Sequence, residues 1–142
     1  MDRHTPQQRS FNMSQVRSRN TKPELFIFSV LDNLSVSYEK HYKILGRPDI
    51  AFPEKRVAVF VNGEFWHGRN YKSESGSYPE FWKNKIGENI KRDRKNYKLL
   101  KVEGWKVIKL WDKNIKKHSV REINKILRSI GAQTIRRTDL KI

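Results

Sequence analysis

The 142-residue sequence contains no cysteine, which excludes disulfide bonds and any zinc site held by thiolates. The four histidines are scattered along the chain, so a structural zinc site built from histidine alone is not expected either. Long apolar runs are also missing, and Met1 is followed by a polar segment that does not resemble a signal peptide. These absences favour a soluble intracellular protein with no membrane segment and no structural zinc.

Acidic residues are scarce relative to basic ones. The 15 Asp and Glu residues stand against 31 Lys and Arg, which gives a formal net charge of +16 and a pI near 10.3. An excess of this size in a folded domain points first to a polyanionic partner, usually nucleic acid. Two alternatives stay open at this point: a charge that serves solubility alone, and attraction to an anionic membrane surface.

The length and the aromatic content fit one domain with one buried core. Hydrophobic residues make up only 36% of the chain, but 4 Trp, 5 Tyr and 7 Phe give the core its bulk. We expect a basic N-terminal arm over residues 1–20, a single folded domain over 21–131, and a short basic tail over 132–142.

Apolar periodicity and helix-capping signals predict the element order α-β-β-β-α-β, followed by a final helix. The first helix begins at a capping box formed by Thr21 and Glu24 and ends near residue 35. Strands are expected at residues 38–45, 49–52, 57–61 and 105–111.

A loop at 64–78 is followed by a long helix from Pro79 to about residue 102, and a closing helix at 119–130 begins with Ser119 as its N-cap. Two strands joined by a helical crossover are parallel. We therefore expect an α/β fold with a mixed four-stranded β-sheet core flanked by helices.

Asp49 is the strongest candidate for binding a divalent cation. It enters a predicted strand between apolar neighbours, directly after Pro48, which favours an extended approach. Carboxylate oxygens suit Mg²⁺, which polarises a phosphate and lowers the pKa of a bound water. The backbone carbonyl of Val61 and the carboxylate of Glu64, at the end of the next strand, are further candidate ligands, and the sequence does not decide between them.

His67 is the candidate proton-transfer base, because histidine titrates near neutrality. A hydrogen-bonded loop histidine is the structural alternative. Glu24 is explained by the capping box, but a helix that faces the active cleft would also let this glutamate orient a catalytic histidine or a metal-bound water.

Aromatic and basic residues supply a candidate DNA interface. Phe65 and Trp66 lie in a glycine-flanked segment, where they either pack in the core or insert between bases as a wedge, and Trp82 would extend the same surface. The long helix carries a basic cluster that would contact phosphates with little sequence information. Its members are Lys91, Arg92, Arg94 and Lys95.

Several motifs in order make the chain similar to one known family. They are RSFNM at 9–13, SRNTKPE at 18–24, GRPDIAF at 46–52, VFVNGEFWHG at 59–68, EFWKNKIGENIKRDRKN at 80–96 and GWKVIKLW at 104–111. The chain resembles the very-short-patch repair (Vsr) endonucleases, which share a PD-(D/E)xK core with type II restriction enzymes. The resemblance covers most of the chain.

The resemblance implies a Mg²⁺-dependent enzyme, using one or two ions, that nicks double-stranded DNA beside a T:G mismatch. Asp49 then matches the principal metal-binding aspartate, the Val61 carbonyl the second metal contact and His67 the catalytic histidine, while Glu24 matches the glutamate that supports that histidine. The aromatics that intercalate beside the mismatch are matched by Phe65, Trp66 and Trp82.

The same resemblance implies where and with what the protein works. It suggests the cytoplasm of a bacterium or archaeon, association with the nucleoid, and mismatch-repair proteins as candidate partners. We expect a monomer, because a single nick needs only one active site.

The chain departs from the family pattern at three places. Asn62 stands where well-known members have a second active-site histidine, so it is a candidate active-site residue and proton transfer would rest on His67 alone. The segments GRNY after His67 and DKN after Trp111 lack the cysteines and histidines of the family's structural zinc site, which implies a zinc-less variant. Glu64 replaces a residue that is often cysteine, and would add a carboxylate ligand.

Two other functions stay open. A Vsr-like restriction or defence endonuclease would cut paired or modified DNA, and a non-catalytic module would keep the fold for DNA binding alone. The presence of Asp49, His67 and Glu24 together argues against the second, because a protein that only binds DNA needs none of them.

Overall fold

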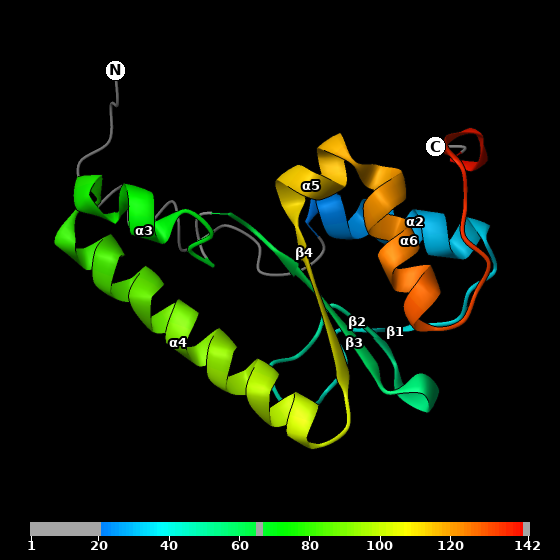
Figure 1. The fold of residues 1–142 in the computed structure, drawn as a ribbon, viewed down its shortest axis with the longest axis horizontal. Coiled ribbons are helices and arrows are strands. Elements are labelled where there is room, and N and C mark those ends of the chain that lie inside the picture. Colours follow the sequence, from blue (N-terminus) through cyan, green and yellow to red (C-terminus); the bar gives the residue numbers. More distant parts are fainter. Residues whose placement is uncertain (1–20, 65–66, 141–142) are drawn as a thin grey trace.

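A mixed four-stranded sheet forms the centre of the computed structural model, which describes residues 21–64 and 67–140 (Figure 1). The strands lie in the order β1-β2-β3-β4; β1 pairs antiparallel with β2, β2 antiparallel with β3, and β3 parallel with β4. Their bounds are β1 Glu39–Lys40, β2 Ile50–Phe52, β3 Val57–Asn62 and β4 Lys106–Trp111.

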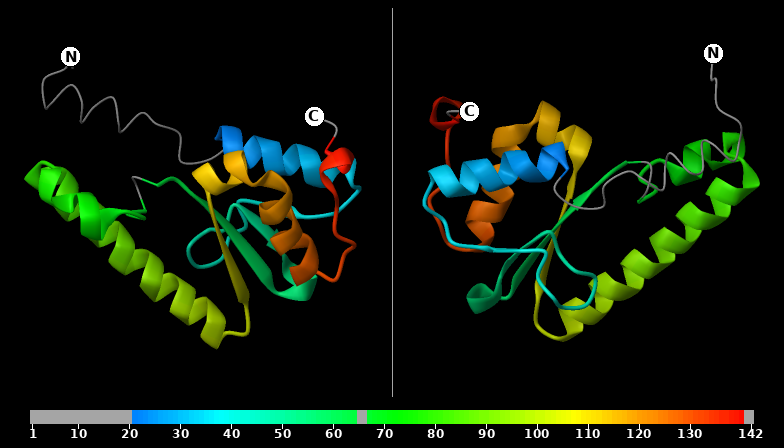
Figure 2. Two further views of the ribbon diagram at one scale, coloured as in Figure 1. Left: turned by 45° about the horizontal axis from the view of Figure 1, so that its top comes forward. Right: turned by 180° about the vertical axis from the view of Figure 1, so that it is seen from behind.

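Helices cover both faces of this sheet. Figure 2 shows α4 on the side of the sheet opposite α2, α5 and α6. The helices span α2 Lys22–Asn33, α3 Tyr71–Glu74, α4 Glu80–Val102, α5 Asp112–Lys117 and α6 Ser119–Ser129, with short 3-10 turns at Pro53–Lys55, Ser75–Ser77 and Arg137–Asp139. The predicted α/β fold with a mixed, helix-flanked sheet is thus confirmed.

The alternation of side chains along β3 explains the two layers. Val57 and Val59 belong to the larger core, which contains buried residues of α2, α5 and α6. Ala58 and Phe60 point the other way and form a smaller core with Leu100 of α4. Successive strand residues face opposite sides of a sheet, so the apolar run of β3 stabilises both layers at once.

Helix α4 returns the chain from β3 to β4 and makes these strands parallel, as predicted. The helix bounds also agree closely with the sequence prediction for α2, α4 and α6. None of the helices in the described ranges is long and apolar enough to cross a membrane.

Three local predictions are wrong. The first strand is only Glu39–Lys40, because the chain turns afterwards through positive φ angles at His41 and Arg47. The predicted loop at 64–78 contains α3, and a further short helix, α5, follows β4 directly. Ser119 is the first residue of α6 rather than its N-cap, and the buried Glu122 forms ion pairs with Arg121 and Lys125.

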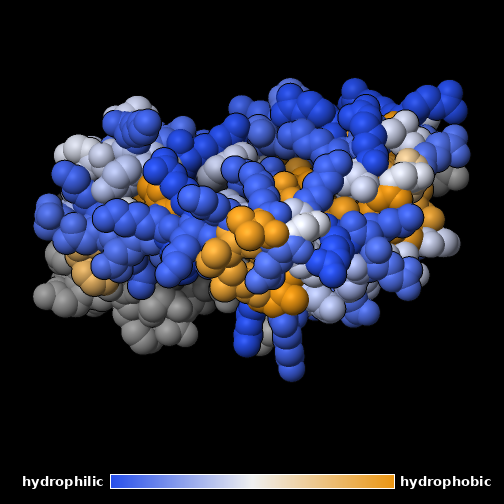
Figure 3. All heavy atoms as spheres, turned by 60° about the horizontal axis from the view of Figure 1, so that its bottom comes forward, coloured by the Kyte–Doolittle hydropathy of each residue, from blue (hydrophilic) through white to orange (hydrophobic). Residues whose placement is uncertain are grey.

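The segment after α6 packs back on that helix. Ile135 is buried, and the Asn124 side chain both donates to its carbonyl and accepts from its N–H. The arm assigned to residues 1–20 lies outside the described residues. Hydrophilic residues cover most of the face drawn in Figure 3, with a small hydrophobic patch near its centre.

Candidate active site

Asp49 lies at the point where the chain enters β2, after a turn with positive φ at Gly46 and Arg47. Its Oδ2 accepts a hydrogen bond of 2.6 Å from the N–H of Val61 in β3. The N–H and C=O of one strand residue face the same neighbouring strand, so the Val61 carbonyl is directed to the same edge of β3 as Asp49.

Asp49 forms a cluster with Glu24 and His41. Each side chain offers a ligand atom, and these atoms lie within 4.8 Å of one another. The residues come from the first turn of α2, from the turn after β1 and from the start of β2. Glu24 is fully buried and also accepts a 2.8 Å hydrogen bond from the Thr21 N–H, so the predicted bond from the helix cap to Glu24 is present and does not remove the residue from the cluster.

The cluster is electrostatically unbalanced. Burial, followed by the neighbouring Glu24 carboxyl, raises the pKa of Asp49 far above its usual range, although the Val61 N–H opposes the shift. Two carboxyl groups and an imidazole held this closely form a donor set that suits a divalent cation.

His41 is the member that the sequence reasoning missed. Its N–H donates to the Asp49 carbonyl at 3.0 Å, so the pairing of β1 with β2 carries it beside Asp49. The register of the β1–β2 pairing places His41 beside Asp49. A strand of two residues gives almost no pattern in the sequence, so this register could not be predicted.

The imidazole of His67 contacts an acidic residue that stands among the basic side chains of α4. Its Nδ1 lies 2.6 Å from Oδ2 of Asp93 in α4, and the side chains are 25% and 15% exposed. A carboxylate at Nδ1 favours the tautomer with its proton on Nδ1, which leaves Nε2 as the base. Arg92 also contacts Asp93, at a longer 3.4 Å.

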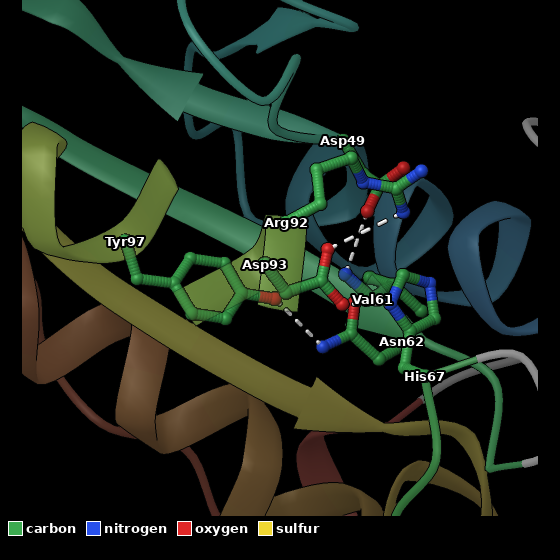
Figure 4. Close-up of polar contacts among 7 residues, drawn as sticks. All are labelled: Asp49, Val61, Asn62, His67, Arg92, Asp93 and Tyr97. Atoms are coloured by element: carbon green, nitrogen blue, oxygen red, sulfur yellow. Dashed lines mark hydrogen bonds and ion pairs between the residues drawn. The ribbon is translucent and has the colours of Figure 1, made fainter. Parts of the chain in front are cut away.

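These groups share a cleft of about 520 Å³ between β3 and α4. Figure 4 shows Asp49, His67, Asp93 and Arg92 converging there. The lining residues are His41, Gly46, Arg47, Asp49, Phe60, Val61, Asn62, His67, Arg92, Asp93, Asn96 and Tyr97.

Asn62 lines the same cleft but holds a different position in it from His67. It is buried, and its Nδ2 donates to the Tyr97 hydroxyl at 3.0 Å. Burial raises the pKa of Tyr97 above its usual range, with the Asn62 bond opposing and the Asp93 charge reinforcing the shift. Asn62 and Tyr97 are therefore a neutral pair in a cleft otherwise lined by ionisable groups.

Glu64 is not part of the Asp49 cluster. Its carboxylate accepts from the Arg69 guanidinium at 3.2 Å and from the backbone N–H of Lys113 at 3.1 Å. The Glu64 carboxylate is thus already hydrogen-bonded, at the start of the loop that carries His67.

The residues predicted to contact DNA occupy different environments. Phe65 and Trp66 lie outside the described residues. Trp82 is only 7% exposed, whereas its neighbour Phe81 is 57% exposed, so Trp82 would have to leave a buried position to stack on a base. The four basic residues of α4 that were predicted to contact DNA are exposed, as a phosphate-binding surface requires; they are Lys91, Arg92, Arg94 and Lys95.

A site of this composition can be compared with known families. The family model of the DNA mismatch endonuclease Vsr matches residues 1–73 of the chain. The chain belongs to the Vsr endonuclease family. It is therefore a DNA endonuclease, and the resemblance read from its motifs is confirmed.

Relatives within the family carry two kinds of name. The type II nicking enzyme V.NmeDIP of Neisseria meningitidis serogroup C is 43% identical over 123 residues, which cover 84% of this chain and 83% of that protein. The type II nicking enzyme V.HpaIIP of Haemophilus parainfluenzae is 34% identical and covers 96% and 100%. The DNA mismatch endonuclease Vsr of Escherichia coli strain K12 is 33% identical and covers 78% and 73%.

The fold itself has a solved counterpart. The catalytic domain of the homing endonuclease I-Bth0305I matches with a TM-score of 0.55 at 20% identity, covering 78% of this chain and 94% of that domain. This likeness concerns the fold alone and agrees with the restriction-endonuclease-like core expected for the Vsr family.

Proposed function

We propose that this Vsr-family endonuclease nicks one strand of duplex DNA at T:G mismatches by Mg²⁺-dependent hydrolysis. The observation that carries the proposal is the meeting of two groups in one cleft: the cation-type cluster that opens through His41 and Asp49, and the His67–Asp93 pair. One group suits a cation and the other suits proton transfer, which are the two requirements of phosphodiester hydrolysis.

Glu24, His41, Asp49 and the Val61 carbonyl would hold the cation. A bound Mg²⁺ would supply charge stabilisation at the phosphate and a lowered pKa for a coordinated water. Oxygen donors predominate in this set, as Mg²⁺ prefers, while the single imidazole also admits Mn²⁺. Glu64 is not assigned to the cation, since its carboxylate is bonded elsewhere.

His67 acts as the general base. Its Nε2 takes a proton from the attacking water while the new P–O bond forms and the P–O bond to the leaving oxygen breaks. Asp93 holds the ring by Nδ1 and stabilises the imidazolium that results. Arg92, which lies beside Asp93 in the cleft, neutralises phosphate charge.

The basic face of α4 positions the duplex. Lys91, Arg94 and Lys95 are exposed on the helix that also carries Asp93, so phosphate contacts on this helix bring the backbone toward the cleft. Phe65 and Trp66 provide the wedge at the mismatch, and Trp82 contributes if binding uncovers it.

The second candidate is a nicking enzyme that acts on paired or modified DNA within a restriction or defence setting. The names of two relatives, at 43% and 34% identity, favour it. Both candidates use the same chemistry and differ in the base pair that they recognise.

One assay separates them. Duplexes that differ only in T:G or C:G at one position, each strand carrying its own label, are incubated with the protein and Mg²⁺. Nicking of one strand of the T:G duplex alone supports mismatch repair, whereas equal cutting of both duplexes supports the alternative. Salt-sensitive binding without cutting would contradict both in favour of a binding module.

On this proposal the protein acts as a monomer, because a single nick needs one active site. It works in the cytoplasm on nucleoid DNA, with mismatch-repair proteins as partners, and the residue range 21–131 forms the catalytic domain.

A further inference from the structure

Glu64 and Arg69 occupy the two ends of the loop that carries His67, and they are bonded to each other. The Arg69 guanidinium lies 3.2 Å from one Glu64 carboxylate oxygen and 3.3 Å from the other. The Glu64 side chain is 12% exposed and that of Arg69 34% exposed, so solvent reaches the pair only in part. Both contacts come from one guanidinium nitrogen, Nη1, and partial burial screens this pair less than an ion pair at an open surface.

The same carboxylate ties the loop to the next layer of the fold. Glu64 Oε1 accepts from the backbone N–H of Lys113 in the first turn of α5, where a negative charge is favourable. The Arg69 guanidinium lies over the Trp111 ring, 5.3 Å from its centroid. We call these four residues, Glu64, Arg69, Trp111 and Lys113, the Glu64 clamp.

The parallel pairing of β3 with β4 makes this contact possible. Asn62 is in register with Trp111, so both strands end at the same edge of the sheet. The chain leaves β3 toward Glu64 and leaves β4 toward Lys113, and the two segments stay adjacent. The clamp lies over the ends of β3 and β4, beside the candidate active site.

His67 lies inside the closed loop. Its N–H donates to the Gly63 carbonyl at 3.2 Å, and the Arg69 N–H donates to the Glu64 carbonyl at 3.0 Å. On the side away from α5, the loop packs closely against α4 at Gly68. There φ is +64°, and a Cβ would clash with the Ile90 side chain. The loop is therefore held between α4 and α5, and among the described residues Asp93 aligns the imidazole from the α4 side.

We propose that the Glu64 clamp positions His67 for catalysis by fixing the loop on the side that Asp93 does not reach. Glu64 and Arg69 are positioning residues, and they contact neither the cation cluster nor the reacting atoms. The proposal rests on the general-base role given to His67 in the proposed function. It assigns the acidic residue that replaces the family's usual cysteine to loop geometry instead of to metal binding.

A double-mutant cycle on the complete protein tests the clamp. Glu64→Ala, Arg69→Ala and the double variant are compared for the single-turnover nicking rate at saturating DNA and for the Kd of the duplex. Glu54→Ala and Lys55→Ala serve as controls, because these residues lie on the exposed turn between β2 and β3 and carry the same charges.

Glu64→Ala is expected to lower the single-turnover rate on the order of 10- to 100-fold, because a small displacement of a catalytic group is costly. The duplex Kd should change by less than about 3-fold, and the loss in the double variant should be well short of the product of the two single losses. Glu64→Gln, which keeps an acceptor for the Lys113 N–H, should restore part of the rate, and both controls should behave as wild type.

Hydrogen exchange of the loop amides gives a readout that does not depend on cleavage. Exchange of the His67 and Arg69 amides, which donate to the Gly63 and Glu64 carbonyls, should become faster in Glu64→Ala and should match wild type in the controls. Unchanged exchange together with an unchanged rate would overturn the clamp and leave the proposed function intact. If wild-type protein cuts no duplex, the proposed function fails, while faster loop exchange in the variant still supports the clamp. If Glu64→Ala does not fold, Glu64→Gln and Arg69→Lys carry the same comparison.

Discussion

Two groups of side chains face the same cleft, and they differ in how their charges are balanced. The Glu24–His41–Asp49 cluster brings two carboxyl groups together, one of them fully buried, and raises the pKa of Asp49. The His67–Asp93 pair joins a base to a single carboxylate and stays partly exposed. In the first group two carboxyl groups lie together, and a bound cation would offset their negative charge, whereas in the second the carboxylate is already paired with the imidazole.

This difference has a consequence for stability. Two carboxyl groups placed together lower the stability of the protein when no cation is bound. Such a loss of stability is common at active sites. The oppositely charged His67–Asp93 pair lowers stability little, and its role is to orient the imidazole. Changes in the first group should therefore alter metal binding, stability and activity together, while changes in the second should alter activity alone.

The largest effect is expected for Asp49→Ala, which removes the central ligand of the cluster. Nicking should fall by roughly 10³-fold or more, because the cation can no longer be held at the phosphate. DNA binding measured by fluorescence anisotropy should remain, since the phosphate-contacting residues are unchanged. Cleavage near the wild-type rate in this variant would disprove the assignment of the cation to this cluster.

The next effect concerns the His67–Asp93 pair. His67→Ala should lower the nicking rate by about 10²- to 10⁴-fold, and Asp93→Asn should lower it within the same range because the amide no longer favours the productive tautomer. The two losses should not add, since both residues serve one proton transfer. Glu88→Gln, a substitution on an exposed part of the same helix, is the control. Additive losses would mean that Asp93 acts independently of His67.

His41 tests whether the cluster includes a nitrogen ligand. His41→Asn should weaken Mn²⁺ binding, measured by calorimetry without DNA, by about 10- to 100-fold. His118→Asn is the matched control, because that histidine is exposed and lies between α5 and α6. Equal Mn²⁺ affinity in the two variants would limit the cation ligands to oxygen atoms.

The smallest effect is on stability in the presence of EDTA. The folded protein binds a proton at Asp49 more tightly than the unfolded chain, whose Asp pKa is about 3.9, so this group makes stability fall as pH rises above that value toward the raised folded pKa. Asp49→Asn should therefore stabilise the metal-free protein by about 1–2 kcal/mol at pH 8. At pH 5 the gain should be smaller.

Urea unfolding at the two pH values measures this difference, with Glu54→Gln as a control for the loss of an exposed charge. Added Mg²⁺ should stabilise wild type more at pH 8 than at pH 5, and should not stabilise Asp49→Asn. A variant that is less stable than wild type at pH 8 would show that the cluster is not strained.

Much of the fold could be predicted because its signals are local. Thr21 and Glu24 mark the start of α2, the apolar run of β3 indicates a strand covered on both faces, and the long periodic segment of α4 implies a parallel crossover. The errors fell where local signals are weak, at a two-residue strand and at helices of four and six residues. Short elements owe their conformation to neighbours in space.

The residues of the candidate site also fall into two classes, those that local motifs predict and those that only the fold brings together. Asp49, His67 and Glu24 were predicted from the sequence, because each lies in a motif that suits a chemical role. His41 and Asp93 were not assigned to the site, because their partners approach only when the hairpin and the α4 crossover have formed. Glu64 was considered as a ligand, and its bonds to Arg69 and Lys113 depend on the parallel register of β3 and β4.

The sequence by itself determined the family, the order of the main elements, the basic character and the residue types available for catalysis. All of these follow from composition, periodicity and motifs, which need no knowledge of contacts. Only the tertiary structure decided which carboxylate lies beside Glu24 and His41, which one holds His67 and which one closes the loop. Asp49, Asp93 and Glu64 carry the same functional group, and the surroundings that distinguish them are built from segments far apart in the chain.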